Sequence, residues 1–286
     1  MRAVTQAIDV LGESPVWSQC EEALYWVDIR APSVARLDAN GVVTRWPLPE
    51  LAGAVMLRRG GGLVLGLKSG LYAFDTATAA LLPLLPVEEG HADNRINDSR
   101  CDARGRIWFS TMWDFGRATT GSLYCVGPGV SCKRVLDGLT VPNAICFSPT
   151  GDRAYFADSS RGAIECLDLD VDTGEIKGRR PFVPAGVAPG KPDGATVDAE
   201  GFVWNARFGA GRLARFSPDG RLDTLVSLPV SNPTSCSFGG PGLRTLFVTT
   251  ATQGLTPQQR EAEPLAGAVL AFEPGVAGLP EPFYAG

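Results

Sequence analysis

The sequence predicts an all-β fold, a single six-bladed β-propeller domain over residues 1–286, and three observations predict it. Short runs rich in Val, Leu, Ile and aromatic residues alternate with clusters of Gly, Pro, Asp and Ser, a pattern typical of strands and turns. One hairpin pattern recurs at intervals of about 40–50 residues, the length of a propeller blade. Helical periodicity is confined to residues 256–264, which excludes a helical solenoid of similar repeat length.

The recurring unit is a turn followed by a strand with an apolar or aromatic side chain at a matching place. Its six copies are the segments 18–29, 57–67, 102–112, 148–158, 198–207 and 240–250. Their reference side chains are Trp26, Leu65, Trp108, Tyr155, Trp204 and Phe247. A unit of this length with about four short strands is a propeller blade, so six copies predict six blades. We expect the reference side chains to pack blade against blade.

Composition limits the partners and the location of the protein. The 26 basic and 31 acidic residues give a net charge of −5, which disfavours nucleic acid or an anionic membrane surface as a partner. The N-terminal residues contain no apolar stretch long enough for a secretory signal, and no run approaches the ~20 apolar residues of a membrane span. We therefore expect a cytoplasmic protein with a small-molecule partner, and the oligomeric state is left open.

Cysteine and histidine usage restricts the chemistry. The seven cysteines form no CxxC pair, so most are expected to be buried thiols, and zinc held by thiolates is disfavoured. The single histidine, His91, excludes a His-rich metal site within one chain, and no GxSxG motif accompanies it. We expect His91 on the rim of the channel without a catalytic duty. Any chemistry then depends on carboxylates, amides, arginines or a metal ion.

Polar residues occupy one register of the repeat. The strand before each hairpin turn is expected to line the central channel, and its first residues include Glu13, Asn97, Asn143 and Asp193. Two carboxylates that converge on the axis repel each other unless a cation lies between them. We therefore predict one divalent metal ion bound by Glu13, Asn143 and Asp193. An all-oxygen site suits Ca²⁺, Mg²⁺ or Mn²⁺ best, and Zn²⁺ or Fe²⁺ remains open. Each of the three residues could instead serve a local turn.

Four residues are predicted to bind substrate. Arg95 and Asn97 lie in the segment that enters the channel, where a guanidinium can donate to sugar hydroxyls, although a surface role for Arg95 is the alternative. Trp113 and Arg207 lie in loops that follow the second strand of a blade and should open at the same mouth. Asp98 is expected to bond backbone amides and to be structural.

Five ordered segments resemble the senescence marker protein/gluconolactonase/luciferin-regenerating family: residues 11–17, 94–112, 141–158, 191–204 and 235–250. The resemblance covers essentially the whole chain and implies a six-bladed propeller. It implies metal ligands at Glu13, Asn143 and Asp193, and substrate-binding residues at Arg95 and Asn97. It further implies hydrolysis of a sugar lactone. The chain departs from animal members at residues 113–114, which puts the substrate in doubt more than the reaction.

The function predicted from these observations is a metal-dependent hydrolase that opens an aldonolactone, of the gluconolactonase or xylonolactonase type. Asp193 is the predicted catalytic base, and direct attack by a water activated on the ion is equally allowed. Two alternatives stay open, a metal-dependent organophosphate hydrolase and a non-catalytic metal-binding propeller. The sequence identifies neither the sugar and its ring size nor the native metal.

Overall fold

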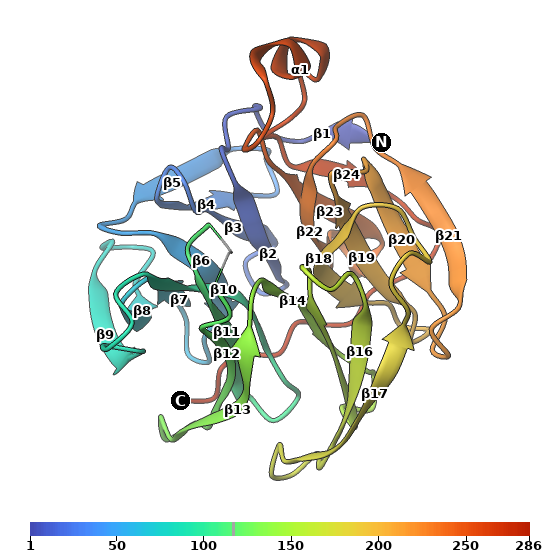
Figure 1. Ribbon diagram of the computed structural model, residues 1–286. Helices are drawn as coiled ribbons and strands as arrows, with labels where there is room; N and C mark the ends of the chain where they lie inside the picture. The colour runs from blue at the N-terminus through green and yellow to red at the C-terminus, as the bar shows by residue number, and fades with distance from the viewer. Residues whose placement is uncertain (116–117) are drawn as a thin grey trace.

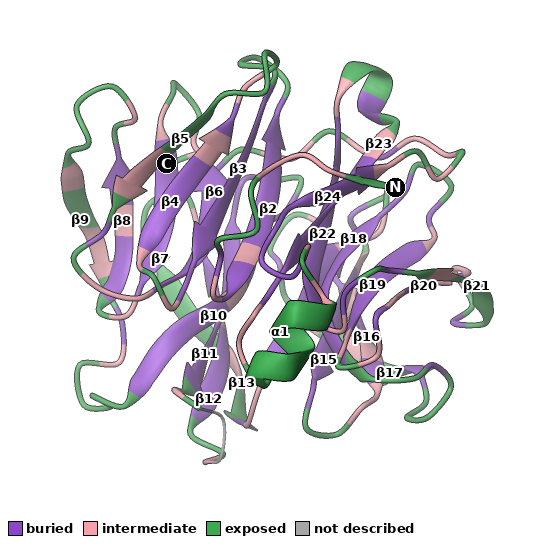
Figure 2. Ribbon diagram, turned by 90° about the horizontal axis from the view of Figure 1, so that it is seen from above, coloured by how far each residue is buried: buried purple, intermediate pink, exposed green. Residues whose placement is uncertain are grey.

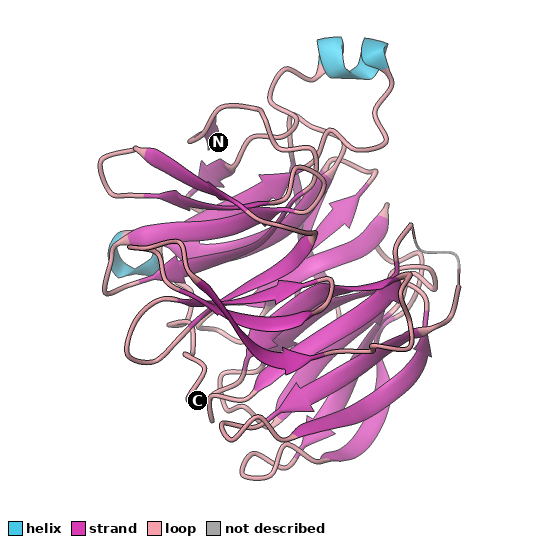
Figure 3. Cartoon of the chain, turned by 90° about the vertical axis from the view of Figure 1, so that its left-hand side faces the viewer, coloured by secondary structure: helices cyan, strands magenta, loops and turns pink. Residues whose placement is uncertain are grey.

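The structure is a computed structural model that describes residues 1–115 and 118–286. Six four-stranded antiparallel sheets are arranged in a ring, which Figure 1 shows face-on. The six-bladed β-propeller predicted from the repeat is confirmed. Figure 3 shows that strands dominate the molecule, and in the described residues helical structure is limited to α1 (Pro257–Ala262) and a 3₁₀ turn at Pro241–Leu243.

Each blade runs from an inner to an outer strand. Blade one is β2 (Gly12–Ser18), β3 (Ala23–Asp28), β4 (Ser33–Leu37) and β5 (Val43–Pro47). Blade two is β6 (Ala52–Leu57), β7 (Leu63–Leu67), β8 (Gly70–Phe74) and β9 (Leu81–Pro86). Blade three is β10 (Asn94–Cys101), β11 (Ile107–Trp113), β12 (Gly121–Val126) and β13 (Cys132–Leu139).

The second half of the ring repeats this order. Blade four is β14 (Pro142–Phe147), β15 (Arg153–Asp158), β16 (Ile164–Leu169) and β17 (Ile176–Val183). Blade five is β18 (Lys191–Val197), β19 (Val203–Phe208), β20 (Arg212–Phe216) and β21 (Leu222–Ser227). Blade six is β22 (Pro233–Gly239), β23 (Thr245–Thr250) and β24 (Leu270–Phe272), completed by the N-terminal strand β1 (Arg2–Ala3).

Two features hold the ring closed. Strand β1 pairs with β24, so one sheet contains both the start of the chain and its last strand. The first strand of each predicted hairpin is the innermost one. Neighbouring inner strands contact one another all the way round the ring, in the order β2, β6, β10, β14, β18 and β22. Their side chains therefore line the axis, as the repeat predicts.

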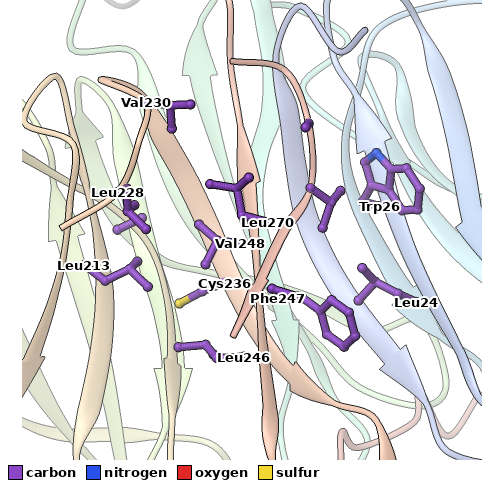
Figure 4. Packing of buried hydrophobic residues seen from close by; sticks show 14 of the residues in the cluster. Leu24, Trp26, Leu213, Leu228, Val230, Cys236, Leu246, Phe247, Val248 and Leu270 are labelled. Carbon is purple, nitrogen blue, oxygen red and sulfur yellow. The ribbon is translucent and has the colours of Figure 1, made fainter. Parts of the chain in front are cut away.

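The core lies between the blades. Figure 2 shows strand interiors buried and connecting loops exposed, and all six reference side chains of the repeat are buried. Figure 4 shows one such cluster, in which Leu213 of blade five, Val248 of blade six and Leu24 of blade one pack together. The three reference tryptophans also donate their indole N–H to a carboxylate at 2.9 Å, Trp26 to Asp9, Trp108 to Asp102 and Trp204 to Asp198.

Several smaller expectations can be compared with the structure. Helix α1 lies within the helical stretch predicted from periodicity, and Thr256 closes a capping box with Gln259 at its start. Five of the seven cysteines are buried and all seven are free thiols. No helix in residues 1–115 and 118–286 combines the length and apolar character needed to cross a membrane.

The C-terminal segment, residues 273–286, crosses from blade to blade. Its backbone bonds Ala199 of blade five, Leu243 of blade six, Leu57 of blade two and Gly105 of blade three. Glu281, within this segment, pairs with Arg100 of the inner strand β10. The end of the chain therefore ties together four blades that are distant in sequence.

Candidate active site

The first residues of four inner strands line a cavity of about 340 Å³. Five of the residues predicted from the sequence border this one cavity: Glu13, Arg95, Asn97, Asn143 and Asp193. They come from blades one, three, four and five, so side chains up to 180 positions apart share one space because the ring brings their strands to the axis.

An irregularity in the inner strands aims these side chains. All six inner strands shift register at this level, and the shift begins at Glu13 in β2 and at Asn143 in β14. The residues that follow, Ser14 and Ala144, have positive φ values of 53° and 62°. A β-bulge re-aims side chains, and strained backbone of this kind clusters at functional sites. In blade five the equivalent place is taken by Gly194, whose missing Cβ leaves room for the Ser235 side chain.

The two carboxylates experience an unfavourable environment. Burial, together with repulsion by Asp98, raises the pKa of Glu13 to about 8. Burial and the charges of Glu13 and Asp98 raise the pKa of Asp193 well above its ordinary value. The charge of Arg95 offsets these effects only in part, so a divalent ion would stabilise the two acids that face this cavity. In the described residues no group of three or more His, Cys, Asp or Glu side chains is placed to hold a metal, so an ion here would need the amide oxygen of Asn143.

A chain of hydrogen bonds fixes both amides. Arg95 Nη1 donates to Asn97 Oδ1 at 2.8 Å, and Asn97 Nδ2 donates to Asn143 Oδ1 at 2.9 Å. Asn143 Nδ2 in turn donates to Ser159 Oγ at 2.9 Å. The bonds settle which end of each amide is the oxygen. Because an amide oxygen has two lone pairs, Asn143 Oδ1 can accept from Asn97 and still contact an ion.

Asp114 joins two arginines at the mouth of the cavity. It accepts from Arg95 Nε at 2.7 Å and, through both oxygens, from Arg30 at 2.7 and 2.8 Å. Burial opposes ionisation of Asp114, but the bonds from Arg30 and Arg95 outweigh it and lower its pKa to about 2. Arg30 also donates to Gln253 at 2.8 Å and lies 4.3 Å from the ring centre of Phe115. The cluster therefore links blades one, three and six.

Two predicted substrate contacts take other positions. Trp113 is 37% exposed and borders a second cavity of about 350 Å³, which shares Phe115 with the first. Arg207 is 2% exposed, and its guanidinium donates to the carbonyls of residues 188, 189 and 190 and to Asn205 Oδ1. Their strand neighbours Met112 and Phe208 line the cavity instead. Since successive side chains of a strand point to opposite faces, the neighbouring residue lines the cavity in each case.

Arg207 supports the site from behind. Its contacts hold the segment that leads into β18, and Asn205 Nδ2, beside it, donates to the carbonyl of Asp193 at 2.7 Å. The guanidinium has no carboxylate partner among residues 1–115 and 118–286, and burial alone lowers its pKa to about 10. Arg207 is therefore a positioning residue for the backbone that carries Asp193.

Asp98 and His91, two further residues considered from the sequence, do not line the cavity. Asp98 accepts from the backbone N–H of Ile145 at 2.8 Å, in the structural role expected of it. His91 is exposed and is not among the residues that line the cavity. Sequence reasoning missed Arg30 and Lys191, which do line it. Arg30 follows the second strand of blade one, so the loop rule that singled out Trp113 and Arg207 would have found it if applied to that blade.

Comparison with known proteins identifies the family. Residues 11–252 match the family model of the SMP-30/gluconolactonase/LRE-like region. The chain belongs to this family. Among curated relatives, the 6-deoxy-6-sulfogluconolactonase of Pseudomonas putida is 36% identical, over 100% of this chain and 99% of that protein. The L-arabinolactonase of Azospirillum brasilense is 34% identical, over 97% and 93% of the two chains.

Solved structures of the SMP-30/gluconolactonase/LRE-like family agree with this assignment. Regucalcin from Agrobacterium tumefaciens, described as a calcium-binding protein, superimposes with a TM-score of 0.95 at 30% identity. The match covers 99% of this chain and 96% of that one. A luciferin-regenerating enzyme superimposes with a TM-score of 0.89 at 27% identity, over 96% and 94% of the two chains. The family resemblance predicted from five sequence motifs is confirmed.

Proposed function

We propose that this chain is a metal-dependent hydrolase that opens a sugar lactone to the corresponding sugar acid. The observation that carries the proposal is the meeting of Glu13, Asn143 and Asp193 with Arg95 and Asn97 in one cavity. Relatives whose names describe lactonases, on 6-deoxy-6-sulfogluconolactone and on L-arabinolactone, support the reaction class.

The donor set fits one divalent cation. Glu13 and Asp193 supply two buried carboxylates with raised pKa values, and Asn143 supplies a neutral oxygen already oriented by Asn97. Hard cations such as Ca²⁺, Mg²⁺ and Mn²⁺ prefer such oxygens. The calcium-binding description of the Agrobacterium regucalcin supports a cation of this kind. When bound, the ion supplies a Lewis acid for the lactone carbonyl and neutralises the two carboxylates.

The residues of the chain then have separate roles. Arg95 uses Nε and Nη1 within the protein, so Nη2 is the group that faces substrate oxygens, beside Asn97. The Asp193 carboxylate accepts a proton as water adds to the carbonyl carbon. When the tetrahedral centre collapses and the ring C–O bond breaks, Asp193 returns this proton to the departing ring oxygen. The product is the hydroxy acid, and Asp193 is again ionised. Apolar walls such as Met112 and Phe208 limit access of bulk water.

A lactone panel tests the proposal. The protein is stripped with a chelator and assayed by acid release on glucono-, xylono- and arabinonolactones with each of Ca²⁺, Mg²⁺, Mn²⁺, Zn²⁺ and Fe²⁺. We expect activity to vanish on chelation and return with one or more ions. Asp193→Ala is expected to lose both tight metal binding, measured by calorimetry, and turnover. Asp223→Asn, on an exposed outer strand, is the control. Full activity of the metal-free protein would overturn the proposal.

The same panel separates the other functions. An organophosphate substrate, assayed with the same ions, would be turned over faster than any lactone if the site were a phosphotriesterase. A non-catalytic propeller would bind the ion and hydrolyse neither substrate. The two arginines at the mouth favour the lactonase, because guanidinium groups suit a polyhydroxylated substrate whose product is an anion.

A further inference from the structure

Positive charge exceeds negative charge around the outer part of the cavity. Three cations, Arg30, Arg95 and Lys191, line it. One carboxylate, Asp114, is shared between the two arginines, and a divalent ion at the proposed metal centre would balance Glu13 and Asp193. Two net positive charges therefore face the mouth. A neutral sugar lactone accounts for the arginines but gives no reason for the lysine.

Lys191 is the cation without an internal partner. Arg30 is paired within the protein, because Nε bonds Gln253 and both terminal nitrogens bond the carboxylate of Asp114. The Lys191 side chain is exposed and makes no ion pair or side-chain hydrogen bond with any residue of 1–115 or 118–286. It is nevertheless part of the cavity wall. Its amine is therefore free to bind a ligand.

Strand geometry sets what Lys191 can reach. It begins β18 two positions before Asp193, so their Cα atoms lie about 7 Å apart along the strand. If the lactone carbonyl sits by Asp193, Lys191 lies near the other end of a six-carbon sugar. The backbone just before Lys191 is fixed by the three carbonyl contacts of Arg207. The lysine therefore extends from an anchored segment.

We propose that Lys191 forms an anion subsite and that the preferred substrate is a lactone with a negatively charged group at the end remote from the carbonyl. Sulfonate and phosphate share the required chemistry, a compact anion that accepts several hydrogen bonds from an ammonium group. This inference rests on the proposed lactonase function. It adds the substrate class to that function and assigns a specificity role to one residue outside the metal centre.

Kinetics of matched lactones test the subsite. Glucono-1,5-lactone is compared with its 6-phospho and 6-deoxy-6-sulfo derivatives in wild type, Lys191→Met and Lys191→Arg. We expect Lys191→Met to lower kcat/KM by about tenfold or more for the charged lactones and by less than about twofold for the neutral one. Lys191→Arg should retain most of the preference. Lys133→Met, on the outer strand β13, is the charge-matched control. The relative response to sulfonate and phosphate shows which anion fits better.

A binding measurement keeps the test independent of turnover. Calorimetry compares 1,5-anhydroglucitol with its 6-phosphate, neither of which can be hydrolysed. Wild type should bind the phosphate more tightly, and the difference should shrink at high salt and in Lys191→Met. Equal binding of the two analogues, or an equal loss of kcat/KM for charged and neutral lactones in Lys191→Met, would overturn the subsite. Failure to hydrolyse any lactone would count against the proposed function alone, since the binding comparison still decides the subsite.

Discussion

The folded environment disfavours the ionised forms of the Glu13 and Asp193 carboxylates. Burial and nearby negative charge raise the pKa of both: Asp98 acts on Glu13, whose pKa reaches about 8, and Glu13 and Asp98 act on Asp193. A carboxylate whose pKa is raised on folding destabilises the folded state wherever it must ionise. These two residues therefore lower the stability of the metal-free folded protein, as expected for the proposed cation site.

This cost predicts how stability depends on pH. Between the ordinary pKa of Glu13, 4.5, and its value of about 8 in the folded protein, the folded state binds more protons than the unfolded one. The free energy of unfolding of the metal-free protein is therefore expected to fall as pH rises through this range. Glu13→Gln should flatten the fall, measured by denaturant unfolding at several pH values, whereas Glu261→Gln on the exposed helix α1 should not. A metal-free protein whose stability rises from pH 5 to pH 8 would contradict the electrostatic account.

Adding the divalent metal ion should restore the free energy of unfolding that is lost as pH rises. At about one hundred times its Kd, a ligand that binds only the folded state adds roughly 2.7 kcal/mol to the free energy of unfolding. We expect this gain in wild type near pH 8 and its absence in Glu13→Gln.

Asp114 gives a second prediction at the scale of single residues. It is a positioning residue, since it holds Arg95 through Nε and leaves Nη2 to the cavity. Asp114→Asn removes the charge that two guanidinium groups share, so Arg30 and Arg95 would repel and Arg95 would lose its orientation. We expect KM for the lactone to rise about tenfold or more while kcat changes less. Asp114→Glu should restore part of the affinity. An equal fall in kcat with unchanged KM would contradict a positioning role.

Side-chain parity explains which single residues could be predicted. Glu13, Asn143 and Asp193 were predicted because one polar register repeats in the channel-lining strands, and the structure places all three along one cavity. Trp113 and Arg207 were chosen by loop position and charge, without knowledge of which face of the strand they occupy. Near the end of a short strand, sequence alone does not reveal which face of the strand a side chain occupies. A shift of one residue there places the side chain either in the cavity or against the backbone behind it.

At the scale of elements, the inner strands share one irregularity. A register shift occurs at the same level in all six, although only some blades carry a proposed metal ligand there. The repeat predicts the register but not the bulge, because no residue pattern common to Glu13–Ser14, Asn143–Ala144 and Asp193–Gly194 announces it. The bulge is a property of strands that crowd at the axis. It re-aims side chains that would otherwise point to opposite faces of the strand.

Crowding at the axis predicts the effect of a single methyl group. In Gly194→Ala the new Cβ would overlap the side chain of Ser235, which lies in the next blade. We expect a loss of about 1–3 kcal/mol in the free energy of unfolding and a weaker metal affinity, because the adjacent Asp193 is displaced. Adding Ser235→Gly should recover part of both. Gly129→Ala, where a Cβ would meet nothing within 4 Å, is the matched control. Unchanged metal binding in Gly194→Ala would show that the bulge tolerates the shift.

At the scale of the whole molecule, the ring depends on both chain ends. The blade count follows from the repeat, but closure by β1 does not, since a strand of two residues leaves no periodic signal. The sequence likewise contains no pattern that predicts the contacts of the C-terminal segment. Its value comes from contacts with blades two, three, five and six, which are local in space and remote in the chain. Such contacts are set by the closed ring and become visible only in three dimensions.

The pair between Glu281 and Arg100 gives the last prediction. Both side chains are nearly buried, with exposed fractions of 8% and 13%, and the pair joins the end of the chain to the inner strand of blade three. Glu281→Gln would leave the Arg100 guanidinium without its ion-pair partner. Breaking a buried pair in this way costs about 3–5 kcal/mol. We therefore expect a clear fall in the free energy of unfolding, measured by denaturant titration, with little change in KM because the pair does not line the cavity. Glu273→Gln, at an exposed position of the same segment, should leave the free energy of unfolding unchanged. A Glu281→Gln variant as stable as wild type would mean that the segment lies on the ring without holding it.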